Sequence, residues 1–167
     1  MTKDEAENLV KPMVKGSTIT KTEDFGDLYA VYFVNEEYYK SQNIEDMMVG
    51  AGPMMVEKST GKIFKTGSAQ SGADYAKSYN ECGSVYGRPS EKILLSKFSN
   101  PDNSKSIIIK IKSMLNLKTD ESKKIIDALN NNESIEIACK NAKEAETAVK
   151  NLQPLGVSAK QLWVKMC

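Results

Sequence analysis

The chain has 167 residues, of which 40% are hydrophobic and 27% charged, which is ordinary for a soluble globular protein and allows one domain or two small ones. Its 23 basic and 22 acidic residues give a net charge of +1, whereas a dedicated nucleic-acid binder usually has a strong basic excess. The chain has no histidine, which removes the commonest general base and metal ligand and argues against most classes of enzyme.

The cysteines and the first residues of the chain indicate the cellular compartment in which the protein is expected. Cys82, Cys139 and Cys167 form no CxxC pair, so neither a disulfide framework nor a zinc site is expected. No apolar stretch follows the basic start, and no run approaches the roughly 18 apolar residues of a membrane span. These features predict a cytoplasmic protein with no membrane segment, no metal and no other cofactor.

The first elements are read from hydrophobic spacing. Apolar residues at helical intervals predict a short helix over residues 4–14, with its last turn disturbed by Pro12. Residues 17–24 are predicted as an edge strand, and the continuous apolar run 28–34 as a strand buried on both faces. Residues 35–50 are polar and are expected to be irregular, with Tyr38, Tyr39, Met47 and Met48 as possible contacts.

A hairpin follows. Gly50-Ala51-Gly52-Pro53 predicts a turn, and residues 54–57 and 62–66 predict two strands joined by a tight connection in which Gly61 takes a positive φ. A glycine-rich loop can also cradle a phosphate, but such a loop opens a helix, whereas a proline and a strand follow here. The structural turn is therefore the favoured interpretation.

Ser71 is predicted to cap the next helix, which runs to about Asn80, with Asp74 as its capping-box partner. Ala73, Tyr75, Ala76 and Tyr79 are expected on its buried side. Without a histidine to act as base, Ser71 is not a candidate nucleophile. Residues 83–90, which contain two glycines and a proline, are predicted to be a linker.

The second part opens with a predicted strand over residues 93–98. Asn100-Pro101 suits the cap and first turn of a helix that continues to Leu115. The β-branched run Ile107-Ile108-Ile109 allows a strand as the alternative.

Three further elements complete this part. Thr119 is predicted to cap a helix that ends at residues 130–132, and residues 134–139 alternate as a half-buried strand does. A helix capped by Asn141 and a final strand over residues 157–164 follow.

The predicted fold class is α+β with two small domains. Residues 1–88 are expected to form an antiparallel-sheet α+β domain, and residues 91–167 a domain with the element order β-α-α-β-α-β. Residues 1–98 carry 12 basic and 14 acidic residues, whereas residues 99–167 carry 11 basic and 8 acidic residues. The two parts therefore differ modestly in net charge, with opposite signs, as two separate units would.

Acidic residues flank the apolar run 28–34, with Glu23 before it and Glu45-Asp46 well after it. A solvated acidic face is the default interpretation, and acid–base or cation chemistry is an alternative. The sharper hypothesis is an acidic surface that meets a basic partner, with tyrosines as anchors. The candidate partner-binding residues are Asp24, Asp27, Glu36, Glu37, Tyr38 and Tyr39.

Lysines gather around the two central helices of the second part. They form either a solvated face or a docking surface for an acidic protein. These residues are Lys110, Lys112, Lys118, Lys123 and Lys124.

Residues 4–82 resemble the YrhB-like immunity protein family (immunity protein 35). The similarity lies in an aromatic strand ending in Asn35, a Gly-Ala-Gly-Pro entry to a strand at 50–53, Thr66-Gly67-Ser68-Ala69, and a helix bearing Tyr75 and Tyr79. The resemblance implies a small α+β domain that is encoded beside a polymorphic toxin and binds it.

Residues 93–164 look like the C-terminal domain of the bacterial ribosomal stalk protein. The similarity runs through the strand 93–98, the stretches 108–112 and 118–126, Glu144-Ala145-Glu146, and the segment from Leu152 to Gly156. This resemblance implies the fold of that domain.

Together these features predict a non-enzymatic immunity protein that neutralises a cognate toxin, the product of the adjacent gene, by direct contact. The alternative is a translation-associated adaptor that binds a GTPase through the stalk-like domain. A carboxylate-dependent enzyme is the third hypothesis, and it requires acidic side chains that converge in a pocket.

Overall fold

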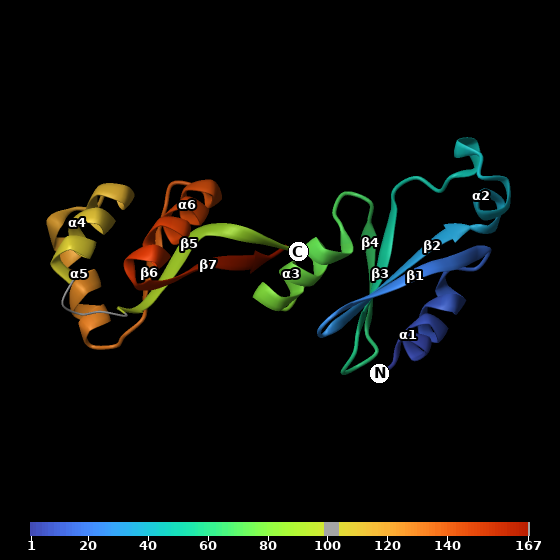
Figure 1. The fold of residues 1–167 in the computed structure, drawn as a ribbon, viewed down its shortest axis with the longest axis horizontal. Coiled ribbons are helices and arrows are strands. Elements are labelled where there is room, and N and C mark those ends of the chain that lie inside the picture. Colours follow the sequence, from blue (N-terminus) through green and yellow to red (C-terminus); the bar gives the residue numbers. More distant parts are fainter. Residues whose placement is uncertain (99–103, 167) are drawn as a thin grey trace. The chain divides into compact units, whose positions relative to one another are not determined.

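The computed structural model describes residues 1–98 and 104–166, so the predicted cap at Asn100-Pro101 lies outside the described residues. The chain is α+β, with antiparallel sheets and six α-helices in the described part (Figure 1). It divides into two compact units, Met1–Gly87 together with Lys165 and Met166 (unit 1), and Arg88–Val164 (unit 2). The predicted second part included Lys165 and Met166, but the Met166 N–H donates to the carbonyl oxygen of Tyr86, 2.9 Å away, which ties the chain end to unit 1.

Unit 1 opens with a helix that is shorter than predicted. Helix α1 spans Lys3–Val10, and a 3₁₀ turn, η1 (Lys11–Met13), follows it. Pro12 cannot donate an α-helical hydrogen bond, which explains the change of geometry. The N-terminus is closed by a capping box between Thr2 and Glu5 that was not predicted.

A four-stranded antiparallel sheet forms the centre of unit 1. Its order is β1-β2-β3-β4, so the predicted edge position of the first strand is confirmed. The strands are β1 (Ser17–Phe25), β2 (Leu28–Asn35), β3 (Ala51–Glu57) and β4 (Ile63–Gly67).

The two faces of the sheet explain why the start of β2 is apolar without a break. Tyr29 and Val31 lie in a core cluster with Ala6 and Val10 of α1. Leu28 and Ala30 lie in a second cluster with residues of α3 (Gly72–Cys82). Since side chains alternate along a strand, both faces of β2 need apolar residues. Burial on both faces holds for Leu28–Val31, whereas Tyr32–Asn35 are half-buried.

Two expectations for the middle of unit 1 are wrong. Residues 35–50 are not irregular throughout, because they form α2 (Glu36–Ser41) and a 3₁₀ turn, η2 (Ile44–Asp46). The predicted turn at Gly50–Pro53 is mostly strand, since β3 starts at Ala51. Only Gly50 in that stretch has a positive φ, +85°.

Two local predictions are confirmed. Gly61 has a φ of +74° in the β3–β4 connection. Helix α3 begins after Ser71, whose side chain accepts from the Asp74 N–H, 3.2 Å away, in the predicted capping box. Ala73, expected on the buried side of α3, is exposed because the buried side is formed by residues three and four apart that begin at Gly72.

Unit 2 has a three-stranded sheet of order β6-β5-β7 and one hydrophobic core cluster that collects residues from all of its strands and α-helices. Strand β5 begins at Gly87, so the second half of the predicted linker is strand. There Ser90 donates to the carbonyl oxygen of Leu162 on β7, 2.9 Å away. The elements are β5 (Gly87–Phe98), α4 (Ser104–Leu115), α5 (Thr119–Asn130), β6 (Ile135–Ala138), α6 (Ala142–Leu152), η4 (Gln153–Leu155) and β7 (Val157–Lys165).

The stretch Ile107-Ile108-Ile109 is helical, which excludes the strand alternative. Ile107 and Ile111, four residues apart, enter the core on one face of α4. The predicted cap at Thr119 is displaced by one residue: Lys118 is the N-cap, and its N–H donates to the Glu121 carboxylate, 2.7 Å away. The predicted Asn141 cap of α6 is confirmed by its bond to the Glu144 N–H.

Candidate functional site

The six residues predicted to bind a partner lie at two separate places in unit 1. Asp24 is near the end of β1 and Asp27 is in the turn to β2, whereas the other four lie in α2, beyond the far end of β2 (Figure 1). Strand β2 has eight residues. At roughly 3.3 Å per residue, it separates the two groups by about 25 Å. The structure therefore brings the residues together within each group but does not join the groups.

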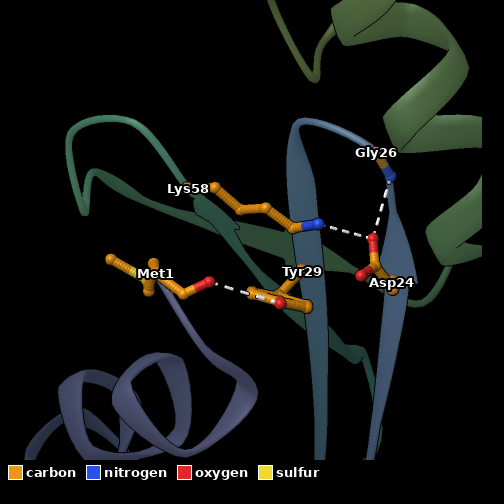
Figure 2. Close-up of polar contacts among 5 residues, drawn as sticks. All are labelled: Met1, Asp24, Gly26, Tyr29 and Lys58. Carbon is orange, nitrogen blue, oxygen red and sulfur yellow. Dashed lines mark hydrogen bonds and ion pairs between the residues drawn. The ribbon is translucent and has the colours of Figure 1, made fainter.

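Asp24 belongs to a polar network at the β1–β2 turn, shown in Figure 2. Its Oδ1 accepts from Lys58 Nζ at 2.6 Å and from the Gly26 N–H at 3.0 Å. The Lys58 ammonium also lies 4.2 Å from the centroid of the Tyr29 ring, and the Tyr29 hydroxyl donates to the carbonyl oxygen of Met1. The bond to Lys58 holds the pKa of Asp24 below its ordinary value. The charge of Asp24 is thus balanced within the chain.

Asp27 lines a shallow open pocket of about 490 Å³ with Lys58, Ser59 and Tyr79. Beside it, the Tyr79 hydroxyl donates to the Glu57 carboxylate, which also accepts from Thr60. The bonds from Thr60 and Tyr79 lower the pKa of Glu57. This group holds the ends of β3 and α3 together, which is a structural role.

The bond to Glu57, together with burial, raises the pKa of Tyr79 to about 12. The folded chain therefore favours the neutral phenol, which adds to the free energy of unfolding. This added stability is fully present below the ordinary pKa of 10.0 and is lost as the pH rises towards 12. In an ultraviolet absorbance titration, we expect Tyr79→Phe to remove a tyrosine ionisation near pH 12. Tyr39→Phe, a change in exposed α2, should leave that ionisation in place. An unchanged titration of the Tyr79→Phe variant would contradict the assignment.

The second group belongs to a surface that we name the acidic–apolar segment, residues 36–49, which connects β2 to β3. Asn35 bonds to it at two points: the side-chain oxygen of Asn35 accepts from the Tyr38 N–H at 3.3 Å, and its amide nitrogen donates to the carbonyl oxygen of Asp46. Gln42 ends α2 with a φ of +54°, and its side chain donates to the Tyr39 carbonyl oxygen at 2.9 Å. Residues 36–46 of the segment therefore have a defined conformation although most of them are exposed.

Large apolar side chains point to solvent from this segment. Ile44 is 78% exposed and Val49 is 86% exposed, and Tyr39, Met47 and Met48 are exposed as well. Sequence reasoning identified the tyrosines and the two methionines as possible contacts but missed Ile44 and Val49. Of the candidate residues in α2, Tyr38 is half-buried, whereas Glu36, Glu37 and Tyr39 are exposed.

We expect Asn35→Ala to loosen the acidic–apolar segment without unfolding unit 1. Loss of a helix N-cap costs about 1 kcal/mol, so amides of residues 38–47 should exchange with solvent several-fold faster. Hydrogen exchange measured residue by residue is the test. The matched control is Asn8→Ala, because Asn8 lies on α1 and contacts Lys11. Equal exchange rates in the two variants would contradict the role of Asn35.

In unit 2 the predicted lysine face is exposed. Ile109, which is 70% exposed on α4, lies next to Lys110 in sequence and close to Lys112. Separately, a groove of about 300 Å³ lies between α5 and β6 and is lined by apolar residues together with Glu121, Lys124 and Glu136. The lysines concerned, Lys110, Lys112, Lys118, Lys123 and Lys124, are all exposed.

Other chemistry finds little support in the part of the chain that the structure describes. Within residues 1–98 and 104–166, no group of three or more Cys, Asp or Glu side chains is placed to hold a metal ion. Cys82 and Cys139 are unlinked and half-buried, and burial raises the pKa of the Cys139 thiol, which disfavours the reactive thiolate.

Comparisons with protein-family models, curated proteins and solved structures find no match to this chain. In the same described residues, no helix has the length and apolar character needed to cross a bilayer.

Proposed function

We propose that this chain is an immunity protein that neutralises a cognate toxin by direct binding in the cytoplasm, and that the acidic–apolar segment is its docking surface. The partner would be the product of the adjacent gene. The protein acts through this contact and performs no catalysis.

The observation that carries the proposal is the concentration of exposed apolar side chains in one segment. Five of the twelve exposed large hydrophobic side chains of the described residues fall between residues 39 and 49. Scattered exposed apolar residues are normal on a monomer, whereas a contiguous group rimmed by polar residues is typical of a protein-binding site. Tyr39 adds an aromatic anchor of the kind that dominates binding energy at interfaces.

The polar network at the β1–β2 turn supports the choice of this surface over Asp24. The carboxylate of Asp24 already has a cationic partner in Lys58, so a second cation would have to displace it.

Co-expression tests the proposal. Cells that express the product of the adjacent gene should die without this chain and grow when it is present. Continued death in the presence of the folded chain would contradict the proposal. Growth restored by wild type but not by a variant altered in residues 39–49 would also place the activity in the acidic–apolar segment.

A second candidate function has its own observation in unit 2. Ile109 is an exposed apolar side chain among lysines, an arrangement suited to an acidic helix or loop of another protein. A translation-associated adaptor that binds a GTPase would use this face. A pull-down from lysate separates the two candidates: elongation factors support the adaptor, whereas capture of the adjacent-gene product alone supports the immunity protein.

A further inference from the structure

We infer that the partner of the acidic–apolar segment presents a cationic surface around an apolar pocket. In this division of roles, the carboxylates of the segment set the rate of association, and its apolar side chains set the lifetime of the complex. The inference rests on the proposed binding function and adds the chemistry of the partner.

Charge complementarity is the first argument. The segment carries four carboxylates, Glu36, Glu37, Glu45 and Asp46, against one cation, Lys40. Lys40 pairs with Glu36 at 3.6 Å, and both side chains are largely exposed, so this ion pair is weak. A net charge of −3 on fourteen residues attracts a basic surface and repels an acidic one.

The apolar side chains are the second argument. Carboxylates alone would serve a solvated face, but Ile44 and Val49, which flank Glu45 and Asp46 in the sequence, expose most of their surface. Binding that removes these side chains from water requires an apolar recess in the partner, rimmed by groups that match the acids. Rim charges act mainly on association, whereas buried contacts act mainly on dissociation.

The defined conformation of the segment is the third argument. The Asn35 bonds to Tyr38 and Asp46, and the bond from Ser41 Oγ to the Asp46 carboxylate at 2.6 Å, fix the path of the chain from α2 to η2. The segment then loses little conformational entropy when it binds, so less of the binding free energy is spent on ordering it.

The experiment measures association and dissociation rates of the full chain with the purified product of the adjacent gene over a series of NaCl concentrations. The test variant is E36Q/E37Q/E45Q, which keeps Asp46 because Ser41 binds it. Its association rate at low salt should fall at least about tenfold and lose most of its salt dependence, while the dissociation rate changes less than about threefold. The matched control E91Q/D127N/E133Q removes the same charge from exposed positions of unit 2 and should leave the association rate within about twofold.

The outcomes separate the inference from the proposed function. If wild type binds and protects cells but the test variant associates as fast as wild type, or no more slowly than the control, the cationic-partner inference is wrong and the proposed function stands. If wild type neither binds nor protects, the proposed function fails and the inference fails with it. Circular dichroism of each variant confirms that the folded state is retained.

Discussion

Replacing Gly52 by alanine is expected to destabilise unit 1 by about 3 kcal/mol, the upper part of the range for overpacking. A Cβ atom on Gly52 would lie 2.1 Å from the carbonyl oxygen of Gly67 and 2.5 Å from its carbonyl carbon. Both atoms are backbone of the paired strand β4, so the clash cannot be relieved by a side-chain rotation. The backbone of β3 or β4 has to move at this irregular part of their pairing, and this loosens the sheet under both core clusters.

Urea unfolding of the full chain measures this effect in each unit separately. All seven tyrosines lie in unit 1, and Trp163, the only tryptophan, lies in unit 2. Near-ultraviolet circular dichroism of tyrosine should show an earlier transition, whereas Trp163 fluorescence should be little changed. The control is Gly67→Ala, whose Cβ meets Gly50 O at an ordinary 3.6 Å and should cost less than about 1 kcal/mol. Equal stability of the two variants would contradict the close approach of β3 and β4.

The double substitution Ile44→Ser/Val49→Ser is expected to weaken partner binding at least about 100-fold while leaving the unfolding free energy within about 0.5 kcal/mol of wild type. Burial of two large aliphatic side chains is worth about 3 kcal/mol, and each 1.4 kcal/mol is a tenfold change in the dissociation constant. Because both side chains are mostly exposed in the free chain, their loss removes little from the core. Isothermal titration calorimetry with the adjacent-gene product measures the affinity.

Ile109→Ser is the matched control for this double variant, since it removes another exposed aliphatic side chain from unit 2. It should bind the adjacent-gene product as wild type does. A loss of affinity in Ile109→Ser, with no loss in Ile44→Ser/Val49→Ser, would move the interface to unit 2 and contradict the placement of the docking surface in the acidic–apolar segment.

Sequence reasoning was most successful where the signal is local. The Ser71–Asp74 and Asn141–Glu144 caps are short-range patterns with one physical cause, and both are present. The apolar start of β2 is similarly direct, because burial on two faces removes the alternation that a one-sided strand shows. Helix α2 was not predicted because its six residues are too few for a hydrophobic periodicity, although its Asn35 cap, its acidic first turn and Lys40 in its last turn were available signals.

The candidate site was harder to predict because it depends on how far apart its residues lie in the folded chain. Asp27 and Glu36 are close in sequence, but an extended strand between them places them at opposite ends of β2. This separation follows from strand geometry once the strand is assigned. The exposure of Ile44 and Val49 does not follow from the sequence, since an aliphatic residue is more often buried than exposed. The close approach of Gly52 to Gly67 requires the β3–β4 register, which is set by nonlocal pairing.

Hydrogen exchange of the full chain, alone and bound to the adjacent-gene product, tests the central claim most directly. If the acidic–apolar segment is the docking surface, amides of residues 36–49 should be protected in the complex, and those of α4 and α5 should exchange as in the free chain. Protection confined to α4 and α5, or to the β1–β2 turn around Asp24, with residues 36–49 unchanged, would contradict the account.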